Sequence, residues 1–172
     1  MYPILSLTEL QALAKEKAIE NQEFRLWVKK HCANQVFDKL IHEISAEVSA
    51  KTDCTKCANC CKYLEAEVSI TEIQAFAEVQ QMEIVDFQKK YVQTDPQKRL
   101  HFFVGKPCHF LQENKCSIYE IRPLACADFP HLHYANMKYR MKTMLENYTL
   151  CPIVFYTLET LKKNLPYQSL LE

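Results

Sequence analysis

The stretch Lys51-Thr-Asp-Cys54-Thr-Lys-Cys57-Ala-Asn-Cys60-Cys61-Lys-Tyr63 places four cysteines within eight residues. A Cys-x2-Cys loop is short enough to aim two sulfur atoms at one metal ion, as it does in zinc sites and iron–sulfur clusters. Because Cys60 and Cys61 are adjacent, their side chains diverge, and we expect one of them to serve a different centre or to support a ligand from outside. This stretch predicts a fold that is organised around bound metal.

Four more cysteines follow the quoted stretch, and the fold can bring them to it. Three cysteines at successive x2 spacing enclose a four-iron cluster in bacterial-type ferredoxins, where a later fourth ligand precedes a proline, and Cys151-Pro152 offers such a pair. Eight thiols match two tetrahedral centres, or one cluster and one single-metal site, and zinc and iron–sulfur clusters both accept them. The candidate metal ligands are Cys54, Cys57, Cys60, Cys61, Cys108, Cys116, Cys126 and Cys151.

Other polar side chains near these cysteines have less specific roles. His109, His131 and His133 could supply nitrogen ligands, although a surface or hydrogen-bonding role is the simpler interpretation of each. Lys62 and Arg122 could lower the pKa of a thiol or donate hydrogen bonds to sulfur. The ninth cysteine lies alone near the N-terminus, where we expect a small buried hydrophobe rather than a ligand.

The composition excludes several classes of function. The 172 residues suggest one domain, and 48% hydrophobic with 24% charged residues is typical of a globular protein. Because 21 basic and 21 acidic side chains cancel, the charge pattern of a nucleic-acid or anionic-membrane binder is absent. Gly105 is the one glycine, which excludes the dinucleotide fingerprint and the P-loop, since both need several glycines.

The N-terminus does not resemble an export signal. Residues 1–10 lack a basic segment, and Glu9 interrupts their apolar run. No stretch approaches the roughly 18–20 apolar residues that cross a bilayer. We therefore expect a cytoplasmic protein, in which clustered cysteines are more often metal ligands or redox groups than disulfides.

Local signals predict a mainly α fold. Residues 6–50 show helical periodicity after a capping box at Ser6, as one long helix or as two helices meeting near Asn34, and a second box begins at Ser69. Residues 100–104 resemble a short strand, residues 131–150 are ambiguous, and Pro152 suits the first turn of a last helix.

These elements predict an N-terminal helix or helical hairpin packed on a small, loop-rich, metal-knit cysteine cluster domain with at most a short β-hairpin. The expected division is a helical segment over residues 1–50 and the cysteine cluster domain over 51–172, together forming one compact unit. Metal would then supply folding free energy to a region with little core of its own.

The cysteine pattern resembles the bacterial YkgJ-type cysteine cluster family, which is named for Cys-x2-Cys-x2-Cys-Cys and described as zinc- or iron-chelating. The family's second block is similar to Pro107-Cys108-x-Phe-Leu and to the run from Cys116-x-Ile-Tyr through Arg-Pro-x2-Cys126-x2-Phe-Pro130, followed by a later cysteine. Many members carry arginine where this chain has Ala127, which leaves any role of that arginine without a counterpart here. The resemblance implies eight cysteine ligands.

Three functions are open at this point. The leading one is a metal-binding protein with zinc or iron–sulfur centres, associated with electron transfer or an oxidoreductase and with an unidentified protein or redox partner. The second is a protein lysine methyltransferase, because a related group, the flagellin lysine N-methylases, looks like iron–sulfur proteins that use S-adenosylmethionine. The third is a thiol redox switch. Whether the chain is an enzyme stays open, and neither a nucleic acid nor a membrane is expected as a partner.

Overall fold

The structure, a computed structural model, describes residues 1–169 and is mainly helical, as the sequence predicts. Its residues form two compact units. Unit 1 is Met1–Cys57 together with the C-terminal segment that starts at Pro130, and unit 2 is Ala58–Phe129. The units differ from the division at residues 50 and 51, because the C-terminal helices pack with the N-terminal ones. The division into functional domains stays a prediction.

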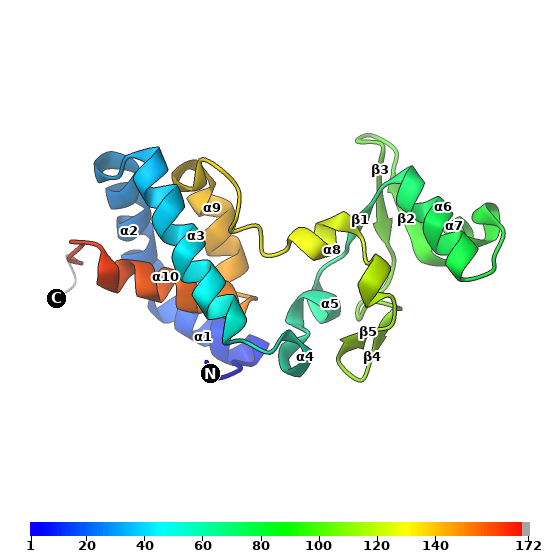
Figure 1. Ribbon diagram of the computed structural model, residues 1–172, viewed down its shortest axis with the longest axis horizontal. Coiled ribbons are helices and arrows are strands. Elements are labelled where there is room, and N and C mark those ends of the chain that lie inside the picture. The colour runs from blue at the N-terminus through cyan, green and yellow to red at the C-terminus, as the bar shows by residue number, and fades with distance from the viewer. Residues whose placement is uncertain (170–172) are drawn as a thin grey trace. The chain divides into compact units, whose positions relative to one another are not determined.

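Unit 1 is a helical bundle (Figure 1). The N-terminal segment is divided at two places: one helix ends at Glu16, the next ends at His31, and the third starts at Asn34, which agrees with the predicted junction near that residue. The helices of unit 1 are α1 (Leu7–Glu16), α2 (Ala18–His31), α3 (Asn34–Ala50), α4 (Cys54–Cys57), α9 (Met137–Tyr148) and α10 (Pro152–Asn164).

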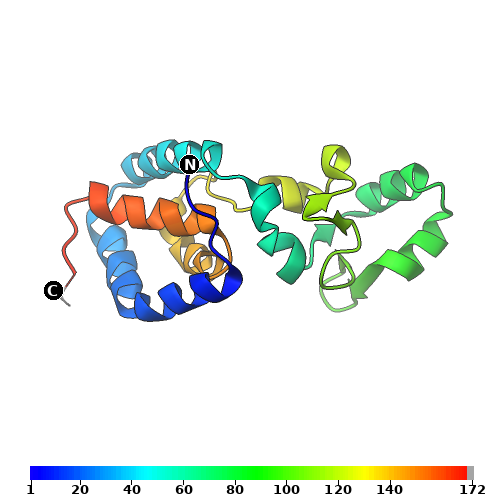
Figure 2. The ribbon, with the colours of Figure 1, turned by 90° about the horizontal axis from the view of Figure 1, so that it is seen from below.

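The core of unit 1 is formed by the apolar faces of its helices. Helix α10 packs against α3 and α9, and α9 also contacts α2 and α3; Figure 2 shows α10 alongside α3. Each large side chain buried in this way stabilises the fold by about 1.5–3 kcal/mol. The largest fully buried members are Leu10, Phe24, Phe37, Ile41, Met137, Met141, Tyr148, Leu158 and Leu161.

The predicted helix starts are confirmed. Ser6 accepts a hydrogen bond from the backbone N–H of Glu9, whose carboxylate accepts one from the backbone N–H of Ser6. Ser69 and Glu72 form the same capping box, and Pro152 occupies the first turn of α10. Helix α9 is different, because Asp38 of α3 accepts hydrogen bonds from the first N–H groups of α9 instead of a local cap.

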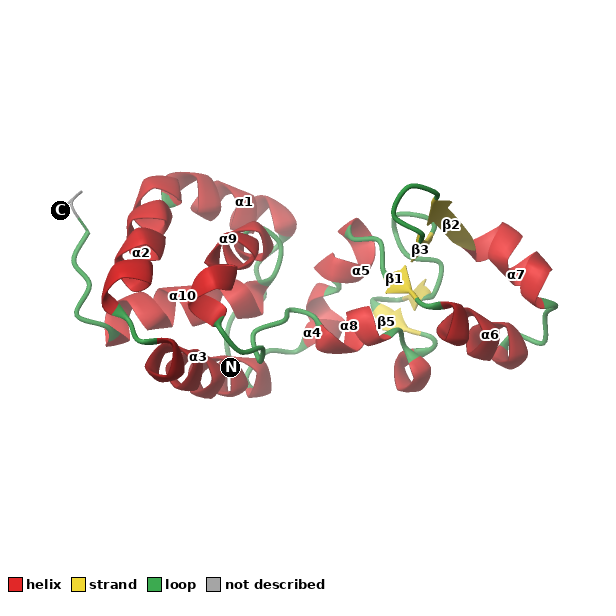
Figure 3. Cartoon of the chain, turned by 90° about the horizontal axis from the view of Figure 1, so that it is seen from above, coloured by secondary structure: helices red, strands yellow, loops and turns green. Residues whose placement is uncertain are grey.

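All described strands belong to unit 2 (Figure 3). Three of them form an antiparallel sheet in the order β1-β3-β2, and β4 pairs with β5 as a hairpin. The elements are α5 (Asn59–Tyr63), β1 (Glu67–Val68), α6 (Ile70–Val79), α7 (Ile84–Tyr91), β2 (Val92–Asp95), β3 (Leu100–Phe103), β4 (Leu111–Gln112), β5 (Lys115–Cys116), the 3-10 helix η1 (Tyr119–Ile121) and α8 (Leu124–Asp128).

A small apolar cluster holds unit 2 together. Phe76, Phe87 and Phe103 pack against one another, with ring centroids 5.3–6.4 Å apart, between the sheet and helices α6 and α7. Cys108 and Cys116 pack against this cluster from outside. Within the described part of the chain, none of the helices has the length and apolar character that a membrane span requires.

Candidate metal centre

Four thiols of unit 2 come from four separate segments and lie close enough to interact electrostatically. One is on α5, one is in the loop after Pro107, one ends β5 and one is on α8. We call this group the unit 2 tetrad; its members are Cys61, Cys108, Cys116 and Cys126.

Every pair within the tetrad is coupled through charge. Burial, and then the charges of the other three thiols, raises the pKa of Cys126 to about 12. Burial also raises the pKa of Cys108 and of Cys116, with the neighbouring thiols adding to it. Four thiolates in one place repel one another, so all four ionise together only when a cation compensates their charge.

Cys61 is the most acidic member of the tetrad. A hydrogen bond between its sulfur and that of Cys60, 3.9 Å apart, lowers the pKa of Cys61 to about 7, against the effect of burial and with help from Lys62. Arg122 lowers the pKa of Cys116 and Cys126 to a smaller extent. Both predicted cations therefore act on thiols, as the sequence suggested.

Backbone contacts hold the segments of the tetrad in place. The N–H of Cys108 donates to the carbonyl of Cys61 at 2.8 Å, which joins the second cysteine block directly to the first. Helix α8 is anchored by Glu72, whose Oε1 accepts from the N–H of Leu124 at 2.7 Å while Oε2 completes the capping box of α6. The capping signal identified Glu72, but nothing in the sequence indicated its second contact.

Three other thiols form a group within unit 1, which we call the unit 1 trio: Cys54, Cys57 and Cys151. Cys54 and Cys57 begin and end α4, and Asp53 orders this turn by accepting from the backbone N–H of Thr55 at 3.0 Å. Cys151 is buried at the start of α10. Burial, and then the charges of Cys54 and Cys57, raises its pKa to about 12, against hydrogen bonds from the first N–H groups of α10.

The structure thus places seven of the eight candidate cysteines in two groups. Cys60 belongs to unit 2, next to Cys61 in sequence, and the boundary between the units passes between Cys57 and Ala58. All nine cysteines are free of disulfide bonds. Among the described residues, no three His, Cys, Asp or Glu side chains already stand in a geometry that would hold a metal ion.

The donor chemistry of both groups nevertheless fits a thiophilic metal. The thiols are uniformly soft ligands gathered from distant segments. Burial, and then the charge of the neighbouring thiols, opposes their ionisation, and a bound cation would favour it.

The candidate histidines all make contacts with aromatic rings. His109 packs edge-on against Tyr91, with ring centroids 5.5 Å apart. His131 stacks on Tyr134 in unit 1, and His133 tilts against the same ring. Cys32 is half-buried at the end of α2, where burial raises its pKa.

Residues 53–152 match the family model CxxCxxCC, a putative zinc- or iron-chelating domain. The chain belongs to this family. The CxxCxxCC match contains all eight candidate cysteines and covers more than half of the chain, including segments of both units. No curated protein and no solved structure matches the chain. The family assignment supports metal binding and leaves the choice between zinc and iron to the chemistry of the site.

Proposed function

We propose that this CxxCxxCC protein binds metal at two thiolate centres, one formed by the unit 2 tetrad and the other by the unit 1 trio. The observation that carries the proposal is the mutual electrostatic coupling of four thiols from four separate segments of unit 2. Four cysteine ligands complete a tetrahedral shell, which is typical of structural zinc and of iron–sulfur sites.

The sequence pattern of the trio favours an iron–sulfur cluster at the second centre. Cys54 and Cys57 have x2 spacing, and Cys151 precedes a proline, as in the ligand run of a four-iron cluster. We therefore assign the iron–sulfur candidate to this centre, with an electron-transfer or oxidoreductase-associated role and a cytoplasmic redox partner. The methyltransferase and the thiol redox switch stay predictions, because no contact described above favours either of them.

The residues of the tetrad have defined tasks in metal uptake. Cys61 is partly ionised near neutral pH and makes the first bond, because its pKa of about 7 is the lowest of the group. The other three thiols must release protons as they bind, so metal affinity rises with pH. Lys62 and Arg122 favour the thiolate forms before metal is present. Bound metal would supply the positive charge that holds the four thiolates together.

Metal and acid-labile sulfide analysis of anaerobically purified protein tests the proposal. We compare Cys126→Ser from the tetrad, Cys151→Ser from the trio and Cys32→Ser as a matched control outside both groups. Each of the first two variants should lose one centre and keep the other, and the double variant should lose both. Cys32→Ser should keep the metal content of the parent protein.

The identity of the metal is determined with the same protein preparations. Iron with sulfide and absorption near 400 nm that disappears in Cys151→Ser alone assigns the cluster to the trio. A colourless protein with stoichiometric zinc removes the cluster and keeps the two-centre assignment. Loss of all metal from either single variant would contradict two separate centres, and loss from Cys32→Ser would contradict the ligand set.

A further inference from the structure

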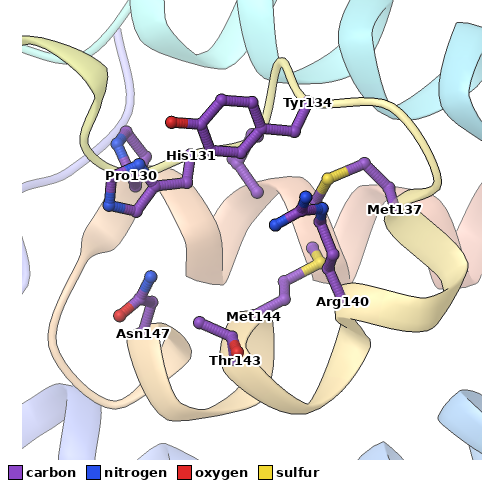
Figure 4. A pocket seen from close by; sticks show the side chains of 9 residues that line it. Pro130, His131, Tyr134, Met137, Arg140, Thr143, Met144 and Asn147 are labelled. Atoms are coloured by element: carbon purple, nitrogen blue, oxygen red, sulfur yellow. The ribbon is translucent and has the colours of Figure 1, made fainter.

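A pocket of about 150 Å³ lies within unit 1 (Figure 4). None of the described residues that line it is a cysteine. The segment before α9 forms one wall, with His131 and Tyr134, and helix α9 forms the other. Figure 4 shows the His131 ring, the Arg140 guanidinium and the Asn147 amide around one common space. The pocket therefore brings several hydrogen-bonding groups together in a small volume.

The charge of this pocket favours an anion. Arg140 is the charged residue of the lining, and among the described residues no aspartate or glutamate side chain lines it. The Arg140 Nε donates to the carbonyl of Ala135 at 3.2 Å, and its guanidinium lies 4.9 Å from the centre of the Tyr134 ring. These contacts use one of the five guanidinium donors and orient the others. A planar, oriented guanidinium binds a carboxylate through two parallel hydrogen bonds.

The wall opposite α9 is held in place before any ligand binds. The imidazole Nε2 of His42 lies 2.9 Å from the carbonyl oxygen of Tyr134. The carboxylate of Asp38 accepts from the backbone N–H groups of Asn136 and Met137, at 2.7 and 2.8 Å. Two side chains of α3 therefore fix this segment over α9. A site that is ordered in advance loses less conformational entropy when it binds.

The remaining lining is apolar and sets the size of the ligand. Leu132, Met137 and Met144 are at most 4% exposed and line the pocket with their side chains. A cavity of about 150 Å³ accommodates a molecule of the size of benzene, which has about six heavy atoms. Methionine adapts its shape to small apolar groups better than other side chains do. The ligand thus needs an anionic end for Arg140 and a short apolar part for the methionines.

We propose that this pocket binds a short-chain organic carboxylate of about six heavy atoms. Its carboxylate pairs with Arg140 and accepts from Asn147, and its hydrocarbon part packs against Met137 and Met144. Inorganic phosphate would satisfy the charge but leave the apolar wall uncovered. The proposal is independent of metal binding, because the lining contains none of the candidate metal ligands.

Titration of the full chain with sodium butanoate, followed by amide chemical shifts, tests the proposal. Saturable shifts confined to residues 130–147 are expected, with a dissociation constant on the order of 1 mM for so small a ligand. Arg140→Gln should raise this constant at least tenfold, and Arg140→Lys should raise it less. The matched control is Lys142→Gln, an exposed cation of the same helix outside the lining, which should leave the constant unchanged.

Two further titrations separate the contributions of charge and apolar contact. Butylamine carries the opposite charge on a similar chain and should cause no saturable shift. Inorganic phosphate should bind at least fivefold more weakly than butanoate. The proposal is overturned if butanoate gives no saturation up to 50-fold above ~1 mM, if Arg140→Gln folds normally and binds as well as the parent protein, or if phosphate binds as tightly as butanoate.

Discussion

Unit 1 and unit 2 are stabilised in different ways. Among the described residues, nineteen buried hydrophobic residues lie in unit 1 and nine in unit 2. Unit 1 buries helical stripes from five helices, whereas unit 2 surrounds one small aromatic cluster with short strands, turns and five cysteines. In compact regions of about 70 residues, a single apolar core rarely supplies more than about 3–5 kcal/mol of stability. The difference teaches where added stability matters most: we expect unit 2 to depend on metal at its thiols more strongly than unit 1 does.

The largest effect is expected from metal removal. A structural four-thiolate site contributes on the order of 10 kcal/mol of apparent binding free energy, all of it coupled to folding. Chelation should therefore raise hydrogen exchange at the amides of Phe103 and Cys108, which donate to Ala66 and Cys61 in unit 2, by at least a hundredfold. The fluorescence of Trp27, on α2 of unit 1, should not change. Equal loss of protection in both units would contradict the comparison.

A smaller effect is expected from an ionic cluster that belongs to unit 1. The Lys162 side chain is 6% exposed and lies 3.0 Å from Glu20 and 2.8 Å from Glu159. Lys162→Met removes a cation that offsets the negative charges of Glu20 and Glu159. This should lower the free energy of unfolding of unit 1 by about 2–4 kcal/mol. Urea unfolding followed by Trp27 fluorescence measures this. Exposed Lys163→Met is the control and should change stability by less than about 0.5 kcal/mol.

The same ionic cluster makes the stability of unit 1 depend on pH in the acidic range. Burial alone would raise the pKa of Glu159, but its contacts with Lys162, Lys17 and Tyr148 lower it below 4.5. A depressed carboxyl pKa stabilises the fold above the unfolded-state pKa, and this contribution is lost as pH falls through the folded-state value. The stability of unit 1 should therefore fall below about pH 4.5, and fall less steeply in Lys162→Met. If stability falls with pH as steeply in the variant as in the parent protein, Lys162 is not the cause of the acid dependence.

In unit 2, the next effect is expected at Gly105, which precedes the loop of Cys108. Its φ of +96° is unfavourable for other residues, and a Cβ there would lie 3.1 Å from the Nε2 of His109. Gly105→Ala should destabilise unit 2 by about 1–2 kcal/mol and weaken metal binding by up to about tenfold. Competition with a colorimetric chelator measures the affinity. Lys106→Ala, at the neighbouring position, should have little effect because its ion pair is exposed.

The smallest effect concerns the hairpin that carries Cys116. Its two-residue turn holds Glu113 at a φ of +48° and Asn114 at +65°, which is the pattern of a type I′ turn. Asparagine tolerates this conformation better than glutamate, so Glu113→Asn should stabilise unit 2 by about 0.5 kcal/mol. Glu113→Val should act in the opposite direction, because a β-branched side chain resists positive φ. Thermal unfolding of the metal-free protein shows both shifts, and equal signs would contradict the turn assignment.

Local signals predicted the elements whose causes are local. The capping boxes at Ser6 and Ser69 and the start of α10 at Pro152 depend on residues within three positions of each other, and all three are present. The start of α9 could not be predicted, because its cap is the carboxylate of Asp38, 98 residues before Asn136. A single sequence contains no sign that two such distant segments meet.

The candidate metal site likewise has features with local causes, which the sequence predicted, and features that depend on tertiary packing, which it did not. The spacing of the cysteines identified the thiols as a group, and adjacency of Cys60 and Cys61 predicted that their roles differ. Which thiols share a centre depends on the path of the chain between them, as for Cys126, which meets Cys61 only after 65 residues. The anchoring of α8 by Glu72 and the pocket beside Arg140 likewise follow from tertiary packing, which residue spacing does not encode.

Unit 1 is discontinuous in the sequence, and this has a consequence for synthesis. Helices α1, α2 and α3 leave the ribosome with their apolar stripes exposed, and they wait for α9 and α10 while all of unit 2 is made. At about 5–20 residues per second, this interval lasts on the order of 10 seconds. Unit 2, which is inserted in the sequence of unit 1, is therefore complete and open to metal while the helical bundle of unit 1 still lacks two helices, and we expect the nascent N-terminal helices to be chaperone clients during that time.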